Sequence, residues 1–407
     1  MTRKRVNLRK WYFSPRKYLF PHLDGLPLTE NRLLKVPGWS ALDLIVDEAE
    51  LAAINKATGT EYLGGAGNEF LTPLFGTQSV FTIDHEMHRL ARKLSMPALS
   101  RKKVDSMHPL VVDIVRSQLD CVMMGSAMKI GHFFRLLANK IAYAFVISPK
   151  LETENVSALH KALEKATGYT ANIVGYTPRL WNSVLTKHIV GKVDSVVYRI
   201  ISESRSEIPN SVLGTFLREQ KKHSYSDRFI RDNIVSIMSA GYDTTGAALT
   251  WMAYWLKDAD NISFLTAPCD AEQRAARIES FVYESLRYCP PLEIIPRRNV
   301  GNDTTLFCPC PHRIHHDAER YSDPHAFKPE RFMAHPPQNR DFLTFGAASR
   351  YCLGAYLAKV VLMTVLNELV ERRITFEFAK TSLTPVRRNV SIWPSYRNIA
   401  VPTSMPD

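Results

Sequence analysis

One ten-residue stretch decides the fold of this chain, and it reads Phe345-Gly346-Ala347-Ala348-Ser349-Arg350-Tyr351-Cys352-Leu353-Gly354. A mostly apolar run, residues 355–370, follows it and predicts a long core helix. A glycine-containing loop therefore brings Cys352 to the start of a helix, where backbone amides and the helix dipole favour a thiolate over a thiol. A thiolate in this position can coordinate a metal ion; a buried structural cysteine is the alternative interpretation.

The composition is that of a globular protein with a large core. The chain has 407 residues, of which 45% are hydrophobic, enough for one large domain or two ordinary ones. Its six cysteines show no repeated CxxC spacing, which indicates free thiols in a reducing cytoplasm. No apolar run of about 18 residues occurs, so we expect no transmembrane span.

The net charge of +12 points to an acidic partner rather than to nucleic acid. The 52 Lys and Arg residues are spread along the chain, without a basic stripe or a nucleic-acid motif. The first 22 residues form a basic N-terminal tail that contains Trp11, Tyr12 and Phe13. We expect either a solvated tail or peripheral contact with an anionic membrane surface.

A second segment, starting at Ser226, predicts an unusually long helix. Ser226 is a favourable N-cap, and apolar residues then recur at helical spacing for about thirty residues, or roughly 45 Å. Its middle reads Ala240-Gly241-Tyr242-Asp243-Thr244-Thr245. A glycine inside a helix costs up to about 1 kcal/mol against alanine, and the Asp and Thr side chains that follow compete for backbone hydrogen bonds. We therefore expect a local distortion, and strained backbone is frequent at functional sites.

Together these two stretches resemble the cytochrome P450 family. The cysteine loop is similar to the family's heme-binding loop at Phe345, Arg350, Cys352 and Gly354, and heme iron is a metal that a single cysteine thiolate holds. Ala348 stands where the family has glycine. If this position needs a positive φ, alanine costs roughly 1–2 kcal/mol there. The resemblance extends from about residue 40 to the end of the chain.

The resemblance implies a mainly α fold with a smaller β portion (α+β), built as a single cytochrome P450-like domain over residues 1–407. A long central helix is expected over the heme, and the cysteine loop is expected to lead into the proximal helix. Between residues 303 and 311 the chain is shorter than the family pattern by about one hairpin. We therefore expect an incomplete main sheet and weaker heme retention.

The resemblance also assigns residues to a cofactor, heme b, with Cys352 as the axial ligand of its iron. His88 and Arg92 are four apart on a predicted helix and share one face; without the resemblance they would be an exposed polar pair. Of the neighbours Arg297 and Arg298, Arg298 aligns better with the family's heme-facing arginine. The residues implied to bind the cofactor are Phe345, Arg350, Cys352, Gly354, His88, Arg92, Arg298, Ala240 and Gly241.

A structural triad is implied around a third motif. Alone, Glu284 and Arg287 are a helix pair of the kind that is usually solvated and contributes little. Pro290-Pro291 and the later segment 327–332 make the pair resemble the family's K-helix. The resemblance therefore implies that Glu284, Arg287 and Arg331 form a buried triad, in which truncating one member costs roughly 3–5 kcal/mol.

The implied function is that of a heme-thiolate monooxygenase, which inserts one oxygen atom from O2 into a lipophilic substrate. Asp243 and Thr244 are implied as the catalytic acid–alcohol pair that relays protons. Electrons come from NAD(P)H through a ferredoxin- or flavodoxin-type donor and its reductase. The residues that match pocket-lining positions of the family are Leu292, Ile294, Ile295 and Ile392.

Two alternatives stay open on the sequence. A heme-thiolate isomerase or peroxide-using enzyme needs no electron donor, although the presence of Asp243 and Thr244 argues against it. A decayed, non-catalytic heme-binding protein is suggested by Ala348 and by the short segment 303–311.

Overall fold

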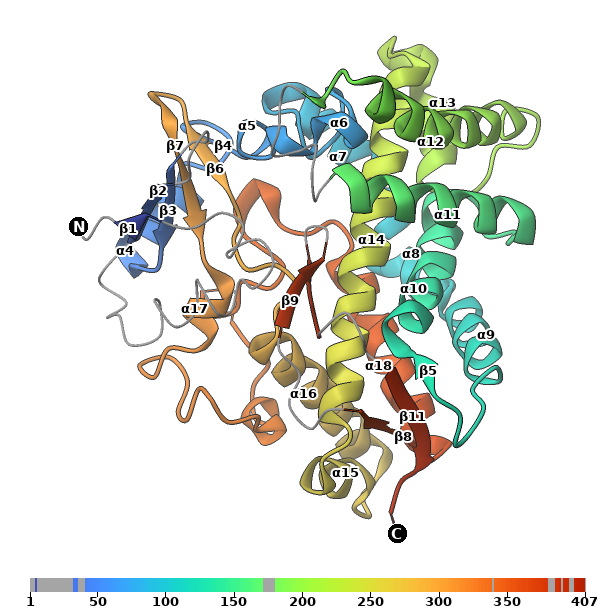
Figure 1. The fold of residues 1–407 in the computed structure, drawn as a ribbon, viewed down its shortest axis with the longest axis vertical. Helices are drawn as coiled ribbons and strands as arrows, with labels where there is room; N and C mark the ends of the chain where they lie inside the picture. Colours follow the sequence, from blue (N-terminus) through green and yellow to red (C-terminus); the bar gives the residue numbers. More distant parts are fainter. Residues whose placement is uncertain are drawn as a thin grey trace.

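A computed structural model describes residues 4–5, 32–35, 41–170, 180–338, 340–379, 385–388, 391–394 and 399–406. Most of this chain is helical, and the main sheet stands to one side of the helices (Figure 1). The predicted mainly α fold with a smaller β portion is therefore confirmed. The predicted N-terminal tail, residues 1–22, lies outside the described residues except for Lys4–Arg5.

The central element is helix α14 (Asp227–Trp255), which crosses the middle of the molecule (Figure 1). It begins as predicted, because the Ser226 hydroxyl accepts a hydrogen bond from the Phe229 N–H. The expected distortion is wrong, since the 29 residues form one uninterrupted α-helix. The Thr244 hydroxyl donates a 2.7 Å hydrogen bond to the Ala240 carbonyl, so it joins the helix without breaking it.

The other helices pack around α14, and the one most closely packed along it is α10. Nearly every side chain of α10 is buried, which explains why its sequence shows no clean polar face. The bounds of these helices are α4 (Glu48–Lys56), α5 (Gly64–Gly67), α6 (Thr72–Phe75), α7 (His85–Leu99), α8 (Arg101–Ser106), α9 (His108–Leu119), α10 (Ile130–Val146), α11 (Thr153–Tyr169), α12 (Val184–Glu203), α13 (Val212–His223), α15 (Ala259–Thr266), α16 (Ala271–Tyr288), α17 (Pro311–His315) and α18 (Ala355–Glu371), with 3-10 turns η1 (Glu69–Leu71), η4 (Pro329–Phe332) and η5 (Ala348–Arg350).

The main sheet is continuous despite the short segment 303–311. Strand β7 pairs in parallel with β3, from Ala41 opposite Thr305 to Ile45 opposite Pro309, and antiparallel with β6 on its other side. The chain then enters α17 directly. The expectation of an incomplete main sheet is therefore wrong. In spatial order the six strands are β1 (Lys4–Arg5), β2 (Arg32–Lys35), β3 (Ala41–Ile45), β7 (Asn302–Pro309), β6 (Arg297–Asn299) and β4 (Tyr62–Leu63).

Two smaller sheets complete the β portion near the C-terminus. One is an antiparallel hairpin, and the other joins the chain end to the start of α10. They consist of β9 (Pro385–Arg388) with β10 (Ser391–Pro394), and of β5 (Met128–Lys129), β11 (Ile399–Ser404) and β8 (Ile374–Phe378). Among all the helices described, none combines the length and apolar character needed to span a bilayer.

Candidate functional site

A cavity of about 360 Å³ lies among α7, α10, α14, α18 and the main sheet. Its lining is mostly apolar, with a thiol and several cationic side chains. The site residues predicted from the sequence that line it are His88, Arg92, Ala240, Gly241, Thr244, Leu292, Ile294, Ile295, Phe345, Arg350, Cys352 and Gly354. The structure therefore brings together, around one space, residues from segments far apart in the chain.

The cysteine loop holds Cys352 at the cavity just before α18 begins. The Cys352 N–H donates a 2.8 Å hydrogen bond to the Phe345 carbonyl, which closes the loop. The side chain is accessible from the cavity, and protein atoms surround its other sides. This burial raises the pKa of the Cys352 thiol, although the Gly354 amide and Arg92 oppose the rise. In the protein alone these influences favour the thiol, whereas a metal cation bound to the sulfur would favour the thiolate.

The backbone at Ala348 has the positive φ that makes this position unfavourable for alanine. Ala348 has a φ of 53°, in the left-handed region that favours glycine. It opens the short turn η5, which leads to Arg350. The cost is roughly 1–2 kcal/mol, and the loop tolerates it while still placing Cys352 at the cavity.

Cationic side chains gather at one part of the cavity lining. Arg92, Arg297 and Arg350 line the cavity, and the carboxylate of Asp84 forms an ion pair with Arg350 and also interacts with Arg297. Burial, reinforced by Arg350, lowers the pKa of Arg297 to about 10. Burial, with Arg350 and Arg92, lowers the pKa of His88 to about 3, so its imidazole is neutral at pH 7. Three guanidinium groups and one carboxylate leave two positive charges uncompensated among the described residues of this group.

These residues fit the cofactor that the sequence resemblance implies. Two uncompensated cations next to an apolar cavity suit a group with two carboxylates, and hydrogen bonds to such ionised groups contribute about 1.5–3 kcal/mol each. Heme carries two propionates, and Cys352 offers its iron a soft ligand from the same cavity. The Nε of Arg350 has no hydrogen-bond partner among the described residues, which leaves a donor for such a group.

Of the two neighbouring arginines, the structure places Arg297, and not the predicted Arg298, at the cavity. Arg297 is buried and lines the cavity, whereas Arg298 does not. Both lie on β6, where successive side chains point to opposite faces of the sheet. The family alignment favoured Arg298, but the register of β6 with β7, in which Arg297 stands opposite Phe307, turns Arg297 to the cavity.

The acid–alcohol pair is split between two sides of α14. Thr244 lines the cavity, but Asp243 is fully buried and does not line it. Instead, the Asp243 carboxylate accepts a 2.8 Å hydrogen bond from the Ser391 hydroxyl and lies 3.6 Å from the Arg135 guanidinium. The expectation that both side chains act at the cavity is therefore corrected: adjacent helical residues point about 100° apart, and only Thr244 faces inward.

Of the four residues predicted to contact the substrate, three line the cavity and one does not. Leu292, Ile294 and Ile295 line the cavity. Ile392 is buried in β10 away from it, where its carbonyl accepts a 3.1 Å hydrogen bond from the Trp251 indole and its N–H bonds the Pro291 carbonyl at 2.9 Å. Ile392 is therefore corrected to a packing residue.

The implied triad comes together away from the cavity. Glu284 and Arg287 are both fully buried and form a two-bond ion pair at 2.7 and 2.8 Å, while the Arg331 Nε lies 3.3 Å from Glu284. Arg287 also donates to the carbonyls of His315 and Pro324. It thus fastens the irregular segment after α17 to α16, which is a structural role.

Sequence reasoning missed Asp84, which organises the cationic group. An Asp directly before a helix is usually its N-cap, but Asp84 makes no capping bond to α7. Its carboxylate accepts 3.0 Å hydrogen bonds from the N–H groups of Gly65 and Ala66 and pairs with Arg350. The glycine cluster of α5 was the available signal, because closely spaced glycines permit close backbone approach.

Comparison with known proteins agrees with this geometry. "Putative cytochrome P450 135B1" of Mycobacterium tuberculosis is 24% identical over 379 residues, covering 86% of this chain and 79% of its own length. Abscisic acid 8'-hydroxylase 1 of Arabidopsis thaliana is 24% identical over 331 residues, covering 74% and 68%.

Two solved structures share the fold. The heme domain of cytochrome P450DA superposes with a TM-score of 0.78 at 14% identity, over 98% of this chain and 94% of that one. Retinoic acid-bound cyanobacterial CYP120A1 superposes with a TM-score of 0.74 at 18% identity, over 92% of each chain. The family model for cytochrome P450 matches residues 45–262 and 277–392. The chain that carries Cys352 at this cavity therefore belongs to the cytochrome P450 family of heme-thiolate monooxygenases.

Proposed function

We propose that this protein inserts one oxygen atom from O2 into a lipophilic organic substrate, with electrons that reach it from NAD(P)H through a ferredoxin- or flavodoxin-type donor. The observation that carries the proposal is the single cavity whose lining combines Cys352, uncompensated cations and apolar side chains. When bound, heme with a thiolate ligand supplies the oxygen-activating chemistry.

The residues around the cavity take separate roles in this proposal. Cys352 holds the iron, and Phe345 beside it limits access of water to the sulfur. Arg92, Arg297 and Arg350 hold the two carboxylates of heme b. The neutral imidazole of His88 supplies a further hydrogen-bond donor to the same group.

Thr244 is the residue to which we assign proton handling at the cavity. Its hydroxyl bonds the Ala240 carbonyl, and a hydroxyl that rotates away from this bond can donate to a group in the cavity. Asp243 is a positioning residue in this proposal: its pairing with Ser391 and Arg135 fixes the rotation of α14 and thereby the direction of Thr244.

The substrate class follows from the apolar lining, including Leu292, Ile294 and Ile295. Two of the similar proteins are named for compounds of this kind, one a hydroxylase of abscisic acid and one with retinoic acid bound. At these identities they support a lipophilic substrate class and not a particular compound.

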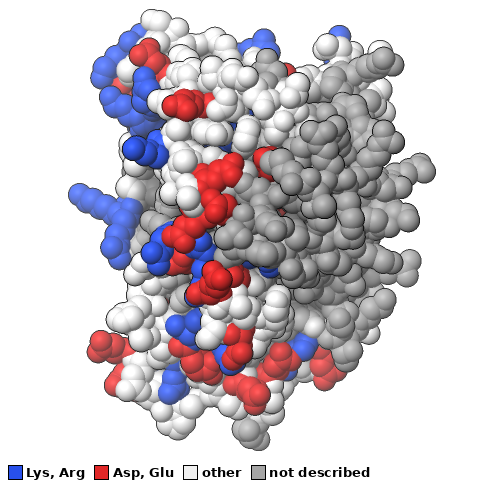
Figure 2. Space-filling model, turned by 90° about the vertical axis from the view of Figure 1, so that its left-hand side faces the viewer, with Lys and Arg blue, Asp and Glu red and all other residues white. Residues whose placement is uncertain are grey.

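Docking of the electron donor is assigned to α7 and α8. Arg89, Lys93, Arg101 and Lys102 are exposed there, and Arg101 lies over the ring of Tyr356 on α18, 5.0 Å from its centre. Arg101 thus links this basic group to the helix that follows the cysteine, and the exposed cations suit an acidic donor. Figure 2 shows acidic side chains interrupting the basic ones on the described part of the face next to the main sheet, so we do not assign docking to that face.

The visible spectrum of the purified protein, reduced and exposed to carbon monoxide, tests the proposal. A strongly red-shifted Soret band is expected for the wild type and for C121A, whose cysteine is exposed on the surface, and its loss is expected for C352A. Absence of heme absorbance in the wild type would support a decayed family member instead.

Turnover then separates the remaining alternatives. With a donor system and NAD(P)H, product formation is expected, and T244A should consume NAD(P)H with less product because proton delivery is impaired. Product formation with peroxide alone, and none with the donor system, would favour a peroxide-using enzyme. Unchanged coupling in T244A would remove Thr244 from its assigned role.

A further inference from the structure

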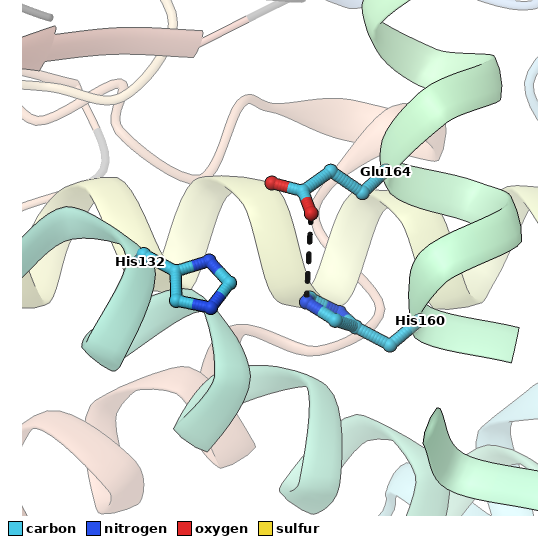
Figure 3. A group of neighbouring side chains, drawn as sticks. All are labelled: His132, His160 and Glu164. Atoms are coloured by element: carbon cyan, nitrogen blue, oxygen red, sulfur yellow. Dashed lines mark ion pairs between the residues drawn. The ribbon is translucent and has the colours of Figure 1, made fainter. Parts of the chain in front are cut away.

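A second group of ligand-type side chains lies outside the cavity, between α10 and α11. His132 comes from α10, and His160 and Glu164 come from α11, four residues apart on one face (Figure 3). The candidate ligand atoms of all three lie within 4.8 Å of one another. None of the three lines the cavity or takes part in the proposed oxygen chemistry.

His160 is the residue that points to a missing ligand. Its side chain is buried, and neither ring nitrogen has a hydrogen-bond partner among the described residues. Glu164 Oε2 lies 3.9 Å from its Nε2, a contact marked in Figure 3 that is too long for a hydrogen bond. A buried polar group left without a partner is destabilising, so a ligand that bonds it would be favoured. Burial lowers the pKa of His160 to about 4, so the ring is neutral at pH 7, and neutral nitrogens are metal ligands.

Arg135 holds the carboxylate of Glu164 in place beside His160. The Arg135 guanidinium donates a 2.8 Å hydrogen bond to Glu164 Oε1 and lies 3.6 Å from Asp243. One buried guanidinium therefore contacts both carboxylates. Because Arg135 binds Oε1, the Oε2 atom is the one turned to His160, and Arg135 fixes the carboxylate in the way that outer-shell partners orient metal ligands.

We propose that His132, His160 and Glu164 bind a divalent cation of the zinc class. Two imidazoles and one carboxylate form a known zinc ligand set, with water in the fourth position, whereas calcium and magnesium prefer oxygen ligands. Bonds of about 2.0–2.1 Å in a tetrahedral site place donors about 3.3 Å apart. His132 is the exposed member of the group, and in this proposal its side chain turns towards His160 and Glu164 when the cation binds.

Zinc itself is the probe. The tag-free holoprotein is treated with a chelator, desalted and titrated with Zn²⁺, and bound zinc is counted after gel filtration. Zinc X-ray absorption then reports the ligand atoms. We expect one zinc per chain with nitrogen and oxygen ligands near about 2.0–2.1 Å. H132A should weaken binding by at least roughly tenfold, since loss of even an outer-shell partner costs 10–100-fold.

H188A is the matched control, because His188 is an exposed histidine on the neighbouring helix α12. It should bind zinc as the wild type does, and both variants should keep the wild-type circular dichroism. Equal zinc affinity in H132A and the wild type would overturn the proposal. So would a sulfur shell near about 2.3 Å, which would place the zinc on cysteines. Neither readout depends on turnover, so the result is independent of the proposed monooxygenase activity.

Discussion

The backbone N–H of Gly65 donates a 3.0 Å hydrogen bond to the Oδ1 atom of Asp84. Asp84 in turn pairs with Arg350, two residues before Cys352. The short helix α5 thus holds the carboxylate of Asp84 in place, and this carboxylate in turn holds Arg350 of the cysteine loop. The close approach is possible because Gly65 has no side chain.

Replacing Gly65 by alanine should disrupt this arrangement. A Cβ atom at residue 65 would lie 2.6 Å from Asp84 Oδ2 and 2.6 Å from the Ile83 carbonyl oxygen. Such overpacking costs roughly 1–3 kcal/mol, so G65A should unfold at lower urea concentration and lose heme faster. G191A is the control, because a Cβ at Gly191 on α12 meets nothing within 4 Å; it should gain up to about 1 kcal/mol from helix propensity. Equal effects of the two substitutions would contradict this account.

Ala348→Gly should stabilise the protein. Glycine adopts the φ of 53° without the Cβ clash, and the expected gain in the free energy of unfolding is about 1 kcal/mol. Urea denaturation and heme retention provide the measurement. A275G, at an exposed position inside α16, should instead lose about 1 kcal/mol. A loss of stability in A348G would show that the loop does not carry the strain.

Arg297 and Arg298 should behave differently towards heme. R297Q removes a buried cation from the cavity lining and should speed heme transfer to apomyoglobin roughly 10- to 100-fold, the equivalent of a lost charged hydrogen bond of about 1.5–3 kcal/mol. R298Q, one residue along the same strand, should change the rate much less. If R298Q speeded heme transfer more than R297Q did, Arg298 would be the heme-binding arginine, as the family pattern favoured.

Lys102→Glu should slow reduction by an acidic electron donor. Exposed charges at the rim of an interface act mainly on the association rate, so the effect should be several-fold at low salt and should shrink as ionic strength rises. Stopped-flow reduction at several salt concentrations checks this. K187E, an equally exposed charge reversal on α12, is the control. If K187E slowed reduction as much as K102E, docking at α7 and α8 would be excluded.

Asp43→Asn should make stability less dependent on pH. Burial, with the nearby Glu50, raises the pKa of Asp43 to about 6, above about 3.9 in the unfolded chain. The folded protein therefore binds the proton of the Asp43 carboxyl more tightly than the unfolded chain does. The stability that this protonated carboxyl contributes is complete below about pH 4 and is lost as the pH rises through 6.

D43N, with a neutral side chain at every pH, should exceed the wild type in free energy of unfolding by about 3 kcal/mol at pH 8, and the difference should vanish towards pH 4. Urea denaturation across this range is the measurement. D113N, at an exposed position on α9, serves as the control and should show no such pH-dependent gain. If the free energies of unfolding of D43N and the wild type differed by the same amount at pH 4 and pH 8, titration of Asp43 would not be the cause.

The sequence predicted best what local chemistry determines. Helix α18 lies where the apolar run 355–370 predicted it, and α14 starts at the cap Ser226. In each case the signal is a cap, a periodicity or an apolar run of adjacent residues.

What failed depended on partners far away in the chain. The choice between Arg297 and Arg298 is a question of strand register, which pairing with β7 decides. The direction of Asp243 is set by Ser391, 148 residues later, and by Arg135 on another helix. No pattern around residue 243 contains that information. The same applies to His132 and His160, which meet only because α10 and α11 pack together.

The pairing of β3 with β7 has a consequence for how the chain is made. Ala41 lies opposite Thr305, so 264 further residues must be synthesised before that edge of β3 meets its partner. At about 5–20 residues per second, a ribosome needs roughly 13–50 s for this distance. During that interval Leu44 and Ile45, which are fully buried in the finished protein, stand on an open strand edge that other chains can join. The sheet order thus leaves this edge of β3 without its partner strand for most of the time that the chain is being synthesised.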